Sequence, residues 1–157
     1  MRTILTKALI ALAITTVAAF GADNTLGTWK LDVAKSKYTP APMPIKSLTV
    51  TREASDGGVK VTITGEQADG TAINATYTAK YDGTPVSVTG QGAPYDTIAI
   101  KQVNANTVTD ERKKTGGPYK ATGRTVVSNG GKTMTNTVKG TNDQGKAFTQ
   151  TFVFEKQ

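Results

Sequence analysis

The sequence contains neither cysteine nor histidine. A chain without these residues has no imidazole base, no thiolate nucleophile and no nitrogen or sulfur ligand for zinc, copper or haem. It also has no disulfide, so its stability must come from burial and from hydrogen bonds between strands. The adjacent carboxylates Asp110 and Glu111 point to opposite faces of a strand and cannot act together on one substrate. We therefore expect no enzymatic activity, no metal site and no cofactor.

Aromatic side chains are also scarce, at 6% of the residues, while lysines are spread along the whole chain. An outer-membrane barrel needs an apolar band and aromatic girdles on its lipid face, so this composition argues against one. No stretch beyond the N-terminal region is apolar for long enough to form a membrane-spanning helix.

The N-terminal region does contain an apolar run, from Ala8 to Ala19, which follows two basic residues. At about 12 residues the run is shorter than a membrane-spanning helix and fits the core of a secretory signal peptide. We predict a signal peptide over residues 1–21, cleaved between Ala19 and Ala22, and a single β-barrel domain over residues 22–157. We expect export to the periplasm or the exterior of a bacterial cell, with no transmembrane span after cleavage.

Basic side chains outnumber acidic ones by 19 to 12, and the loss of Arg2 and Lys7 with the signal peptide would leave a net charge of +5. The excess lies mostly in the C-terminal half, where nine basic residues occur: Lys101, Arg112, Lys113, Lys114, Lys120, Arg124, Lys132, Lys139 and Lys146. Neighbouring hairpins that carry these residues would form a broad basic surface, which suits an anionic polysaccharide or lipid head groups. Only Tyr119 lies among these charges, so specific nucleic-acid binding by base stacking is not expected. Lysines on strands also keep a sheet soluble and discourage edge pairing.

Turn signals recur along the chain as Asp-Gly, Asn-Gly and Gly-Gly pairs, each of which supplies a residue that tolerates positive φ. Alternating apolar and polar residues fill the intervals, as in a β-meander. The strands predicted in this way are 28–31, 48–53, 59–65, 71–81, 86–89, 96–103, 107–114, 119–128, 133–140 and 147–156. No segment after the signal peptide carries an apolar stripe of helical period. An all-β antiparallel meander follows, closed as a barrel or packed as a two-sheet sandwich.

The segment Leu26-Gly27-Thr28-Trp29-Lys30-Leu31 holds the only tryptophan and resembles the first strand of the lipocalin and fatty-acid-binding barrels, the calycins. The segment 152–156 resembles the last strand of the fatty-acid-binding proteins. The resemblance implies an up-and-down, lipocalin-like β-barrel of roughly 8–10 strands, in which Gly27 and Trp29 close one end. In lipocalins an arginine stacks on this tryptophan. Arg124 is the candidate here, although alternation along its strand places it on the outer face.

The chain departs from these families in three places. A proline connector, residues 39–44, stands where the fatty-acid-binding proteins have a helical lid. Phe152 and Phe154 stand where that family has the arginine and tyrosine that hold the ligand carboxylate. No Thr-Asp-Tyr motif of the lipocalins follows. The start of the domain and its proline connector also resemble small exported bacterial proteins that are themselves uncharacterised.

Two strands place apolar side chains on one face and are expected to line the interior. One face carries Ile73, Ala75, Tyr77, Ala79 and Tyr81, and the other carries Phe148, Gln150, Phe152 and Phe154. These aromatics fit a packed core, whereas an open lumen would make Tyr77 and Tyr81 ligand-lining. Small side chains expected to point inward leave space for a ligand: Ala75, Ala79, Ala99, Ala121 and Gly123.

The strand 107–114 adds two charges to this interior. If Val108 points inward, so do Asp110 and Arg112, because every second residue of a strand shares a face. The planar guanidinium of Arg112 suits a carboxylate or phosphate group. We predict a non-enzymatic protein that binds a small amphiphile, with Arg112 and Asp110 at the ligand. Two alternatives stay open: Arg112 as a solvated rim charge, and a barrel of the cell envelope that acts through its basic surface or a protein partner.

Overall fold

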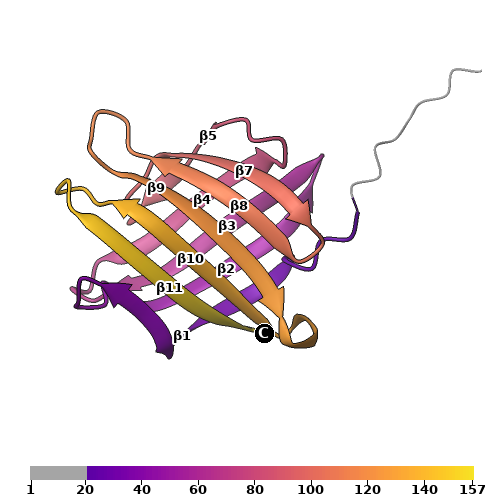
Figure 1. The fold of residues 1–157 in the computed structure, drawn as a ribbon, viewed down its shortest axis with the longest axis horizontal. Coiled ribbons are helices and arrows are strands. Elements are labelled where there is room, and N and C mark those ends of the chain that lie inside the picture. The colour runs from indigo at the N-terminus through magenta and orange to yellow at the C-terminus, as the bar shows by residue number, and fades with distance from the viewer. Residues whose placement is uncertain (1–20) are drawn as a thin grey trace, which may run out of the picture.

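Eleven antiparallel strands form one sheet that curls into a nearly closed barrel (Figure 1). The computed structural model describes residues 21–157, and all of the predicted signal peptide but Gly21 lies outside them. The strands are β1 (Gly27–Thr39), β2 (Ile45–Ser55), β3 (Gly58–Gln67), β4 (Ala72–Lys80), β5 (Val86–Ser87), β6 (Thr89–Gln91), β7 (Thr97–Asn104), β8 (Thr107–Lys113), β9 (Lys120–Ser128), β10 (Thr133–Thr141) and β11 (Ala147–Lys156). A short 3-10 turn, η1 (Asn129–Gly131), joins β9 to β10. No helix in the described part is long and apolar enough to cross a membrane.

The first strand joins the two halves of the sheet, β2–β4 and β7–β11, because it pairs on both sides. Trp29 on β1 lies opposite Val50 on β2 and opposite Lys156 on β11. The short strands β5 and β6 lie at the two edges of the sheet. An isolated bridge between Asp82, which follows β4, and Lys101 on β7 links the two sides of the opening at one point. The predicted all-β meander is confirmed, and the alternative of two packed sheets is wrong.

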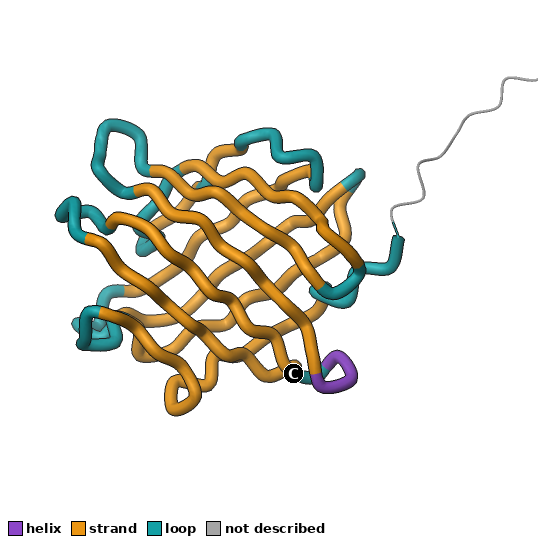
Figure 2. Tube along the Cα trace, in the orientation of Figure 1, coloured by secondary structure: helices purple, strands orange, loops and turns teal. Residues whose placement is uncertain are grey.

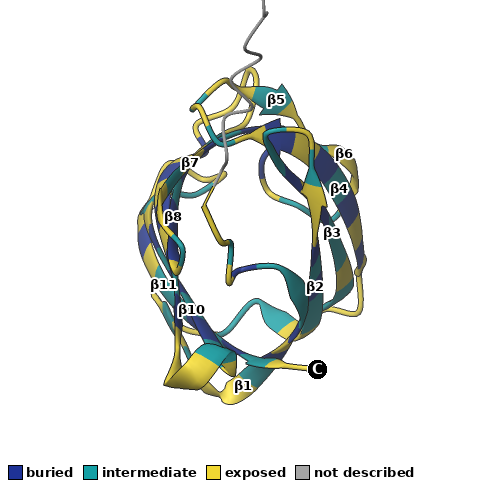
Figure 3. Cartoon of the chain, turned by 90° about the vertical axis from the view of Figure 1, so that its right-hand side faces the viewer, coloured by how far each residue is buried: buried dark blue, intermediate teal, exposed yellow. Residues whose placement is uncertain are grey.

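Inward and outward residues alternate along the strands, as a half-buried sheet requires. On β4 every second residue from Ile73 to Ala79 is buried, and on β9 the same holds from Ala121 to Val127. Figure 3 shows the alternation as buried and exposed bands along the ribbons. The inward placement predicted for Ala99 is wrong, since Ile98 and Ile100 hold the inner positions of β7 and leave Ala99 on the outer side.

β1 continues well beyond the predicted 28–31. Its pairing with β11 breaks after Asp32 and resumes at Lys37, so the residues between them form a bulge. The Ser36 hydroxyl closes the bulge, since it donates to the Asp32 carbonyl (2.6 Å) and accepts from the Val153 amide (3.0 Å). Beyond it Tyr38 returns to pairing, opposite Gln150. The bulge interrupts the alternation that marks a strand in sequence.

The connections between strands are short loops at the two ends of the barrel (Figure 2). We call the end at which β1 begins the closed end, because Trp29 is fully buried there. The segment that precedes β1 crosses the opening of the barrel at this end (Figure 3). The Asn24 amide donates to the Ala105 carbonyl (2.8 Å), and the Asn24 side chain donates to Asn106 (2.7 Å), so the segment is fixed to the β7–β8 turn.

Candidate functional site

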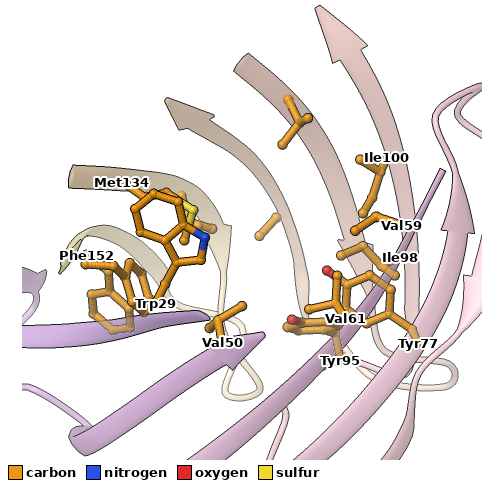
Figure 4. Close-up of a cluster of buried hydrophobic side chains, with 14 of the residues drawn as sticks. Trp29, Val50, Val59, Val61, Tyr77, Tyr95, Ile98, Ile100, Met134 and Phe152 are labelled. Carbon is orange, nitrogen blue, oxygen red and sulfur yellow. The ribbon is translucent and has the colours of Figure 1, made fainter. Parts of the chain in front are cut away.

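A cavity of about 440 Å³ lies inside the barrel. Its walls are mainly apolar and aromatic, and the buried side chains converge on it from strands on opposite sides (Figure 4). The lining includes Leu48, Val50, Val61, Ile63, Ile73, Ile100, Val108, Met134, Phe152 and Phe154. At the end opposite the closed end it reaches residues of the connecting loops, including Pro94 and Asn142. We call this end the mouth.

Four aromatic rings form a continuous arc near the mouth. Tyr38 stacks on Phe148 and Phe148 contacts Tyr119, each with ring centroids 5.8 Å apart. Tyr119 stacks on Tyr95, with centroids 6.0 Å apart. Pairs at these separations contribute beyond the area that they bury. The arc gives the outer part of the cavity an aromatic wall.

Asp110 and Arg112 form an ion pair in the wall of the cavity. Arg112 Nε donates to Asp110 Oδ1 (2.6 Å) and Nη2 donates to Oδ2 (3.2 Å), with the two side chains 13% and 6% exposed. Nη2 also donates to Asn136 Oδ1 (3.4 Å), and the guanidinium carbon lies 5.2 Å from the centre of the Tyr95 ring. Burial opposes the charge of Arg112, but the Asp110 carboxylate raises the pKa of Arg112 well above its ordinary value. The Arg112 guanidinium therefore keeps its charge, and the Asp110 carboxylate is its counterion.

The pair depends on a glycine across the sheet. Gly123 on β9 lies opposite Asp110 on β8, and a β-carbon at Gly123 would lie 2.5 Å from Asp110 Oδ2. The missing side chain leaves the space that the carboxylate occupies.

At the closed end Arg52 and Trp29, both buried, hydrogen-bond to the segment that precedes β1. Trp29 Nε1 donates to the carbonyl of Thr25 (2.9 Å), and Arg52 Nε donates to the Thr25 hydroxyl (3.1 Å). That hydroxyl donates to Asp23 Oδ1 (2.6 Å), and Tyr81 donates to Asp23 Oδ2. Arg52 is 6% exposed and also lines the cavity. The cavity lining thus has Arg52 at the closed end, the ion pair farther toward the mouth, and the exposed Asp143 in a loop at the mouth itself.

The structure places the predicted site residues in three groups. Asp110, Arg112 and Tyr77 line the cavity, so the inward placement of the first two is confirmed and Arg112 is not a solvated rim charge. Tyr81 is half-buried at the closed end, where its hydroxyl donates a hydrogen bond to Asp23. The prediction that Arg124 stacks on Trp29 is wrong, because Arg124 is at an outward position of β9 and is exposed.

Trp29 has a cation above it from another strand. Lys156 Nζ lies 5.1 Å from the centre of the Trp29 ring, since these two residues face each other across the β1–β11 pairing. Gly27 is the third member of this end: its φ is 122°, and a β-carbon there would lie 2.9 Å from Lys156 Cε. Gly27 and Trp29 thus occupy the closed end, as predicted, with Lys156 in the place expected for Arg124.

The sequence interpretation missed Arg52, Asn136 and Tyr95 as cavity residues. Arg52 shares a face with Val50 on β2, and this alternation was the available signal. Asn136 reaches Arg112 only through the register of β9 and β10, and Tyr95 lies in a loop, where alternation gives no direction.

The outer surface carries most of the basic residues of the C-terminal half. Of the nine basic residues between positions 101 and 146, all but Arg112 are exposed. A groove over β7 to β10 has the basic residues Lys101, Arg124 and Lys139 in its lining, together with the acidic residues Asp110 and Glu111. Among residues 21–157, no group of three or more acidic residues is placed to hold a metal ion.

Comparisons with known proteins define the fold only. No protein-family model matches the chain, and no curated protein matches it. Among solved structures, the chain is similar to a protein of unknown function from the DUF3598 family of Nostoc punctiforme, with a TM-score of 0.51 and 17% identity. The likeness is one of fold. It covers 85% of this chain and 47% of that protein, so the chain spans about half the length of its structural relative.

The tyrosines predict how stability depends on pH. Burial raises the pKa of Tyr77, Tyr81 and Tyr95, and it raises the pKa of Tyr119 to about 12. The unfolded chain loses these protons near pH 10. The folded state therefore binds more protons between about pH 10 and 12, and we expect a stability that is complete below pH 10 to fall as the pH rises through this window.

Absorbance at 295 nm measures tyrosinate directly and separates it from lysine titration over the same range. Denaturant unfolding at each pH gives the stability. Native tyrosines that ionise near pH 10 would contradict the prediction. With no histidine and no cysteine in the chain, stability is expected to be nearly constant between about pH 6 and 9.

Proposed function

We propose that this protein is an exported, lipocalin-like, non-enzymatic barrel that binds a small amphiphilic molecule in its cavity. The observation that carries the proposal is the cavity itself: about 440 Å³, with mostly apolar walls and a few polar groups that converge on it. Known ligand pockets have volumes of about 300–1,000 Å³ and the same mixture of wall types. The aromatic arc suits an apolar body, and the charged and amide groups suit a polar end.

The interior chemistry supports binding rather than catalysis. Asp110, a carboxylate inside the barrel, is held by two guanidinium hydrogen bonds from Arg112. A general base must be free to accept a proton from a substrate. The apolar run before the barrel, with its preceding basic residues, supports export.

A basic outer face that binds an anionic polysaccharide or lipid head groups is the second candidate. The exposed cations and the groove over β7 to β10 favour it. The two candidates differ in the surface they use, so a substitution inside the barrel affects only the first.

Native mass spectrometry of protein purified gently from its host is expected to show a small molecule that is lost on denaturation. The recombinant protein is expected to bind N-phenylnaphthylamine, a neutral fluorescent probe of apolar cavities. Ile63→Trp fills the cavity from β3 and should weaken this binding about tenfold, because the ring occupies the volume that the probe needs.

Thr64→Trp is the matched control, since the next residue on β3 is exposed on the outer face. This variant should bind the probe as the unchanged protein does. Equal loss in both variants, or no binding by the unchanged protein and no retained molecule, would refute the cavity proposal. Retention on heparin in all three proteins would then favour the outer face.

A further inference from the structure

Arg52 is a buried cation that lacks a complete set of partners. Its side chain donates through Nε to the Thr25 hydroxyl, whereas Nη2 is buried and has no hydrogen-bond partner among residues 21–157. The residue as a whole is 6% exposed. A buried charge with an unsatisfied donor is strongly destabilising unless another group compensates it. The buried, unpartnered Nη2 of Arg52 therefore indicates that a further group binds there.

The carboxylate of Asp23, at the same end of the barrel, is engaged by other groups. Asp23 accepts hydrogen bonds from the Thr25 amide (2.9 Å), the Thr25 hydroxyl (2.6 Å) and the Tyr81 hydroxyl. It reaches Arg52 only through Thr25. This chain of contacts fixes the Nε edge of the guanidinium on the closed end and leaves Nη2 without a partner. Arg52 is in fact part of the cavity lining.

Arg52 differs in this respect from Arg112. Both Arg112 Nε and Arg112 Nη2 bind Asp110, so that charge is already neutralised. The acidic residues of the cavity lining are Asp110 and Asp143, and Asp143 lies exposed in the loop after β10, at the mouth. Arg52, at the closed end, is therefore a positive charge without a paired carboxylate. One uncompensated positive charge matches a monoanion, and the planar guanidinium suits a carboxylate.

An apolar path leads from Arg52 toward the mouth. Leu48, Val50 and Arg52 share the inward face of β2, and all three line the cavity. The distance along the strand from Arg52 to Leu48 is about 13 Å at the usual rise per residue. Beyond Leu48 the cavity reaches Tyr38 and the aromatic arc. A ligand with an anionic head and an apolar tail fits this sequence of surfaces from end to end.

We propose that Arg52 binds the carboxylate of a monoanionic amphiphile at the closed end of the cavity, with the apolar tail directed toward the mouth. The inference rests on the proposed binding function and adds the class of head group and its anchor. Tyr77 shares a row of the sheet with Arg52, since both lie opposite Val61 on β3, and both line the cavity. Burial raises the pKa of Tyr77. A tyrosine that keeps its proton is available as a second donor.

The test compares two amphiphiles with the same tail, dodecanoate and dodecanol, as competitors of N-phenylnaphthylamine. The unchanged protein should bind dodecanoate more tightly than dodecanol. In Arg52→Met the affinity for dodecanoate should fall about 10- to 100-fold, the range of a hydrogen-bonded charge contact, while dodecanol binds as before. Arg52→Lys should recover part of the loss, because it restores the charge without the planar fork. Acetate, a free carboxylate without a tail, should compete weakly or not at all.

Arg124→Met is the matched control, because it removes the same charge from the exposed outer face of β9. It should leave both affinities unchanged. The thermal midpoint separates a binding role from a structural one: Arg52→Met should unfold at the same or a higher temperature than the ligand-free protein, since it removes an unsatisfied buried donor.

Two results would overturn the inference, and they distinguish failure of the Arg52 anchor from failure of the cavity proposal. If dodecanol and the probe bind but dodecanoate binds equally to the unchanged protein and to Arg52→Met, Arg52 is not the anchor while the cavity proposal stands. If neither amphiphile nor the probe binds to the unchanged protein, both proposals are wrong.

Discussion

Replacement of Trp29 by alanine is expected to lower the free energy of unfolding by about 3–5 kcal/mol, the usual cost of truncating a large buried aromatic side chain. Trp29 is fully buried at the closed end. Its indole nitrogen holds the segment before β1 through the Thr25 carbonyl (2.9 Å), and its ring lies under Lys156. The alanine variant loses the ring volume and leaves the Thr25 carbonyl without its donor.

Denaturant unfolding followed by circular dichroism measures this loss. Trp29→Phe keeps most of the ring but not the hydrogen bond, and it should retain part of the stability. Val103→Ala is the surface control, because Val103 is 53% exposed. It should change the stability by less than about 0.5 kcal/mol. A Trp29→Ala variant as stable as Val103→Ala would show that the closed end does not depend on the indole.

The positions of the strands followed closely from the sequence wherever alternation was uninterrupted. The last strand was predicted over 147–156 and is found at those residues. The first strand was predicted to end at Leu31, yet β1 runs to Thr39. The bulge after Asp32 interrupts the alternation of apolar and polar residues. The prolines directly after Thr39 predict an irregular connector, so the second half of the strand was not recognised. The single strand predicted over 86–89 is two short edge strands.

The candidate site was only partly predictable, because alternation gives a face and not a partner. It correctly placed Asp110 and Arg112 inside the barrel. It could not show that the two form an ion pair, since that depends on side-chain conformations and on the glycine opposite Asp110. Arg52 was overlooked, although Val50 marks its face, because an arginine in a strand normally points to solvent. These contacts could be predicted only if the pairing of the strands were already known.

The ion pair inside the barrel leads to the second large effect. Asp110→Ala is expected to destabilise the protein by about 3–5 kcal/mol, because it leaves the Arg112 guanidinium buried without its counterion. The side chains of Asp110 and Arg112 are 6% and 13% exposed, so solvent screens the pair only weakly. Asn136 accepts one long hydrogen bond from Arg112 (3.4 Å) and is neutral, so it compensates little of the charge.

The double variant Asp110→Ala, Arg112→Met separates the unpaired charge from the lost side-chain volume. Removing both charges is expected to cost less than removing Asp110 alone, because no buried ion is left without a partner. Lys46→Ala is the control for an exposed pair: Lys46 binds Glu66 at 2.7 Å, but the two side chains are 65% and 38% exposed. That change should cost no more than about 1 kcal/mol, and less at high salt. Urea unfolding of all four proteins gives the comparison. If the double variant is at least as unstable as Asp110→Ala alone, the loss comes from the space beside Gly123 that the carboxylate fills, and the pair is not the source of the stability of this wall.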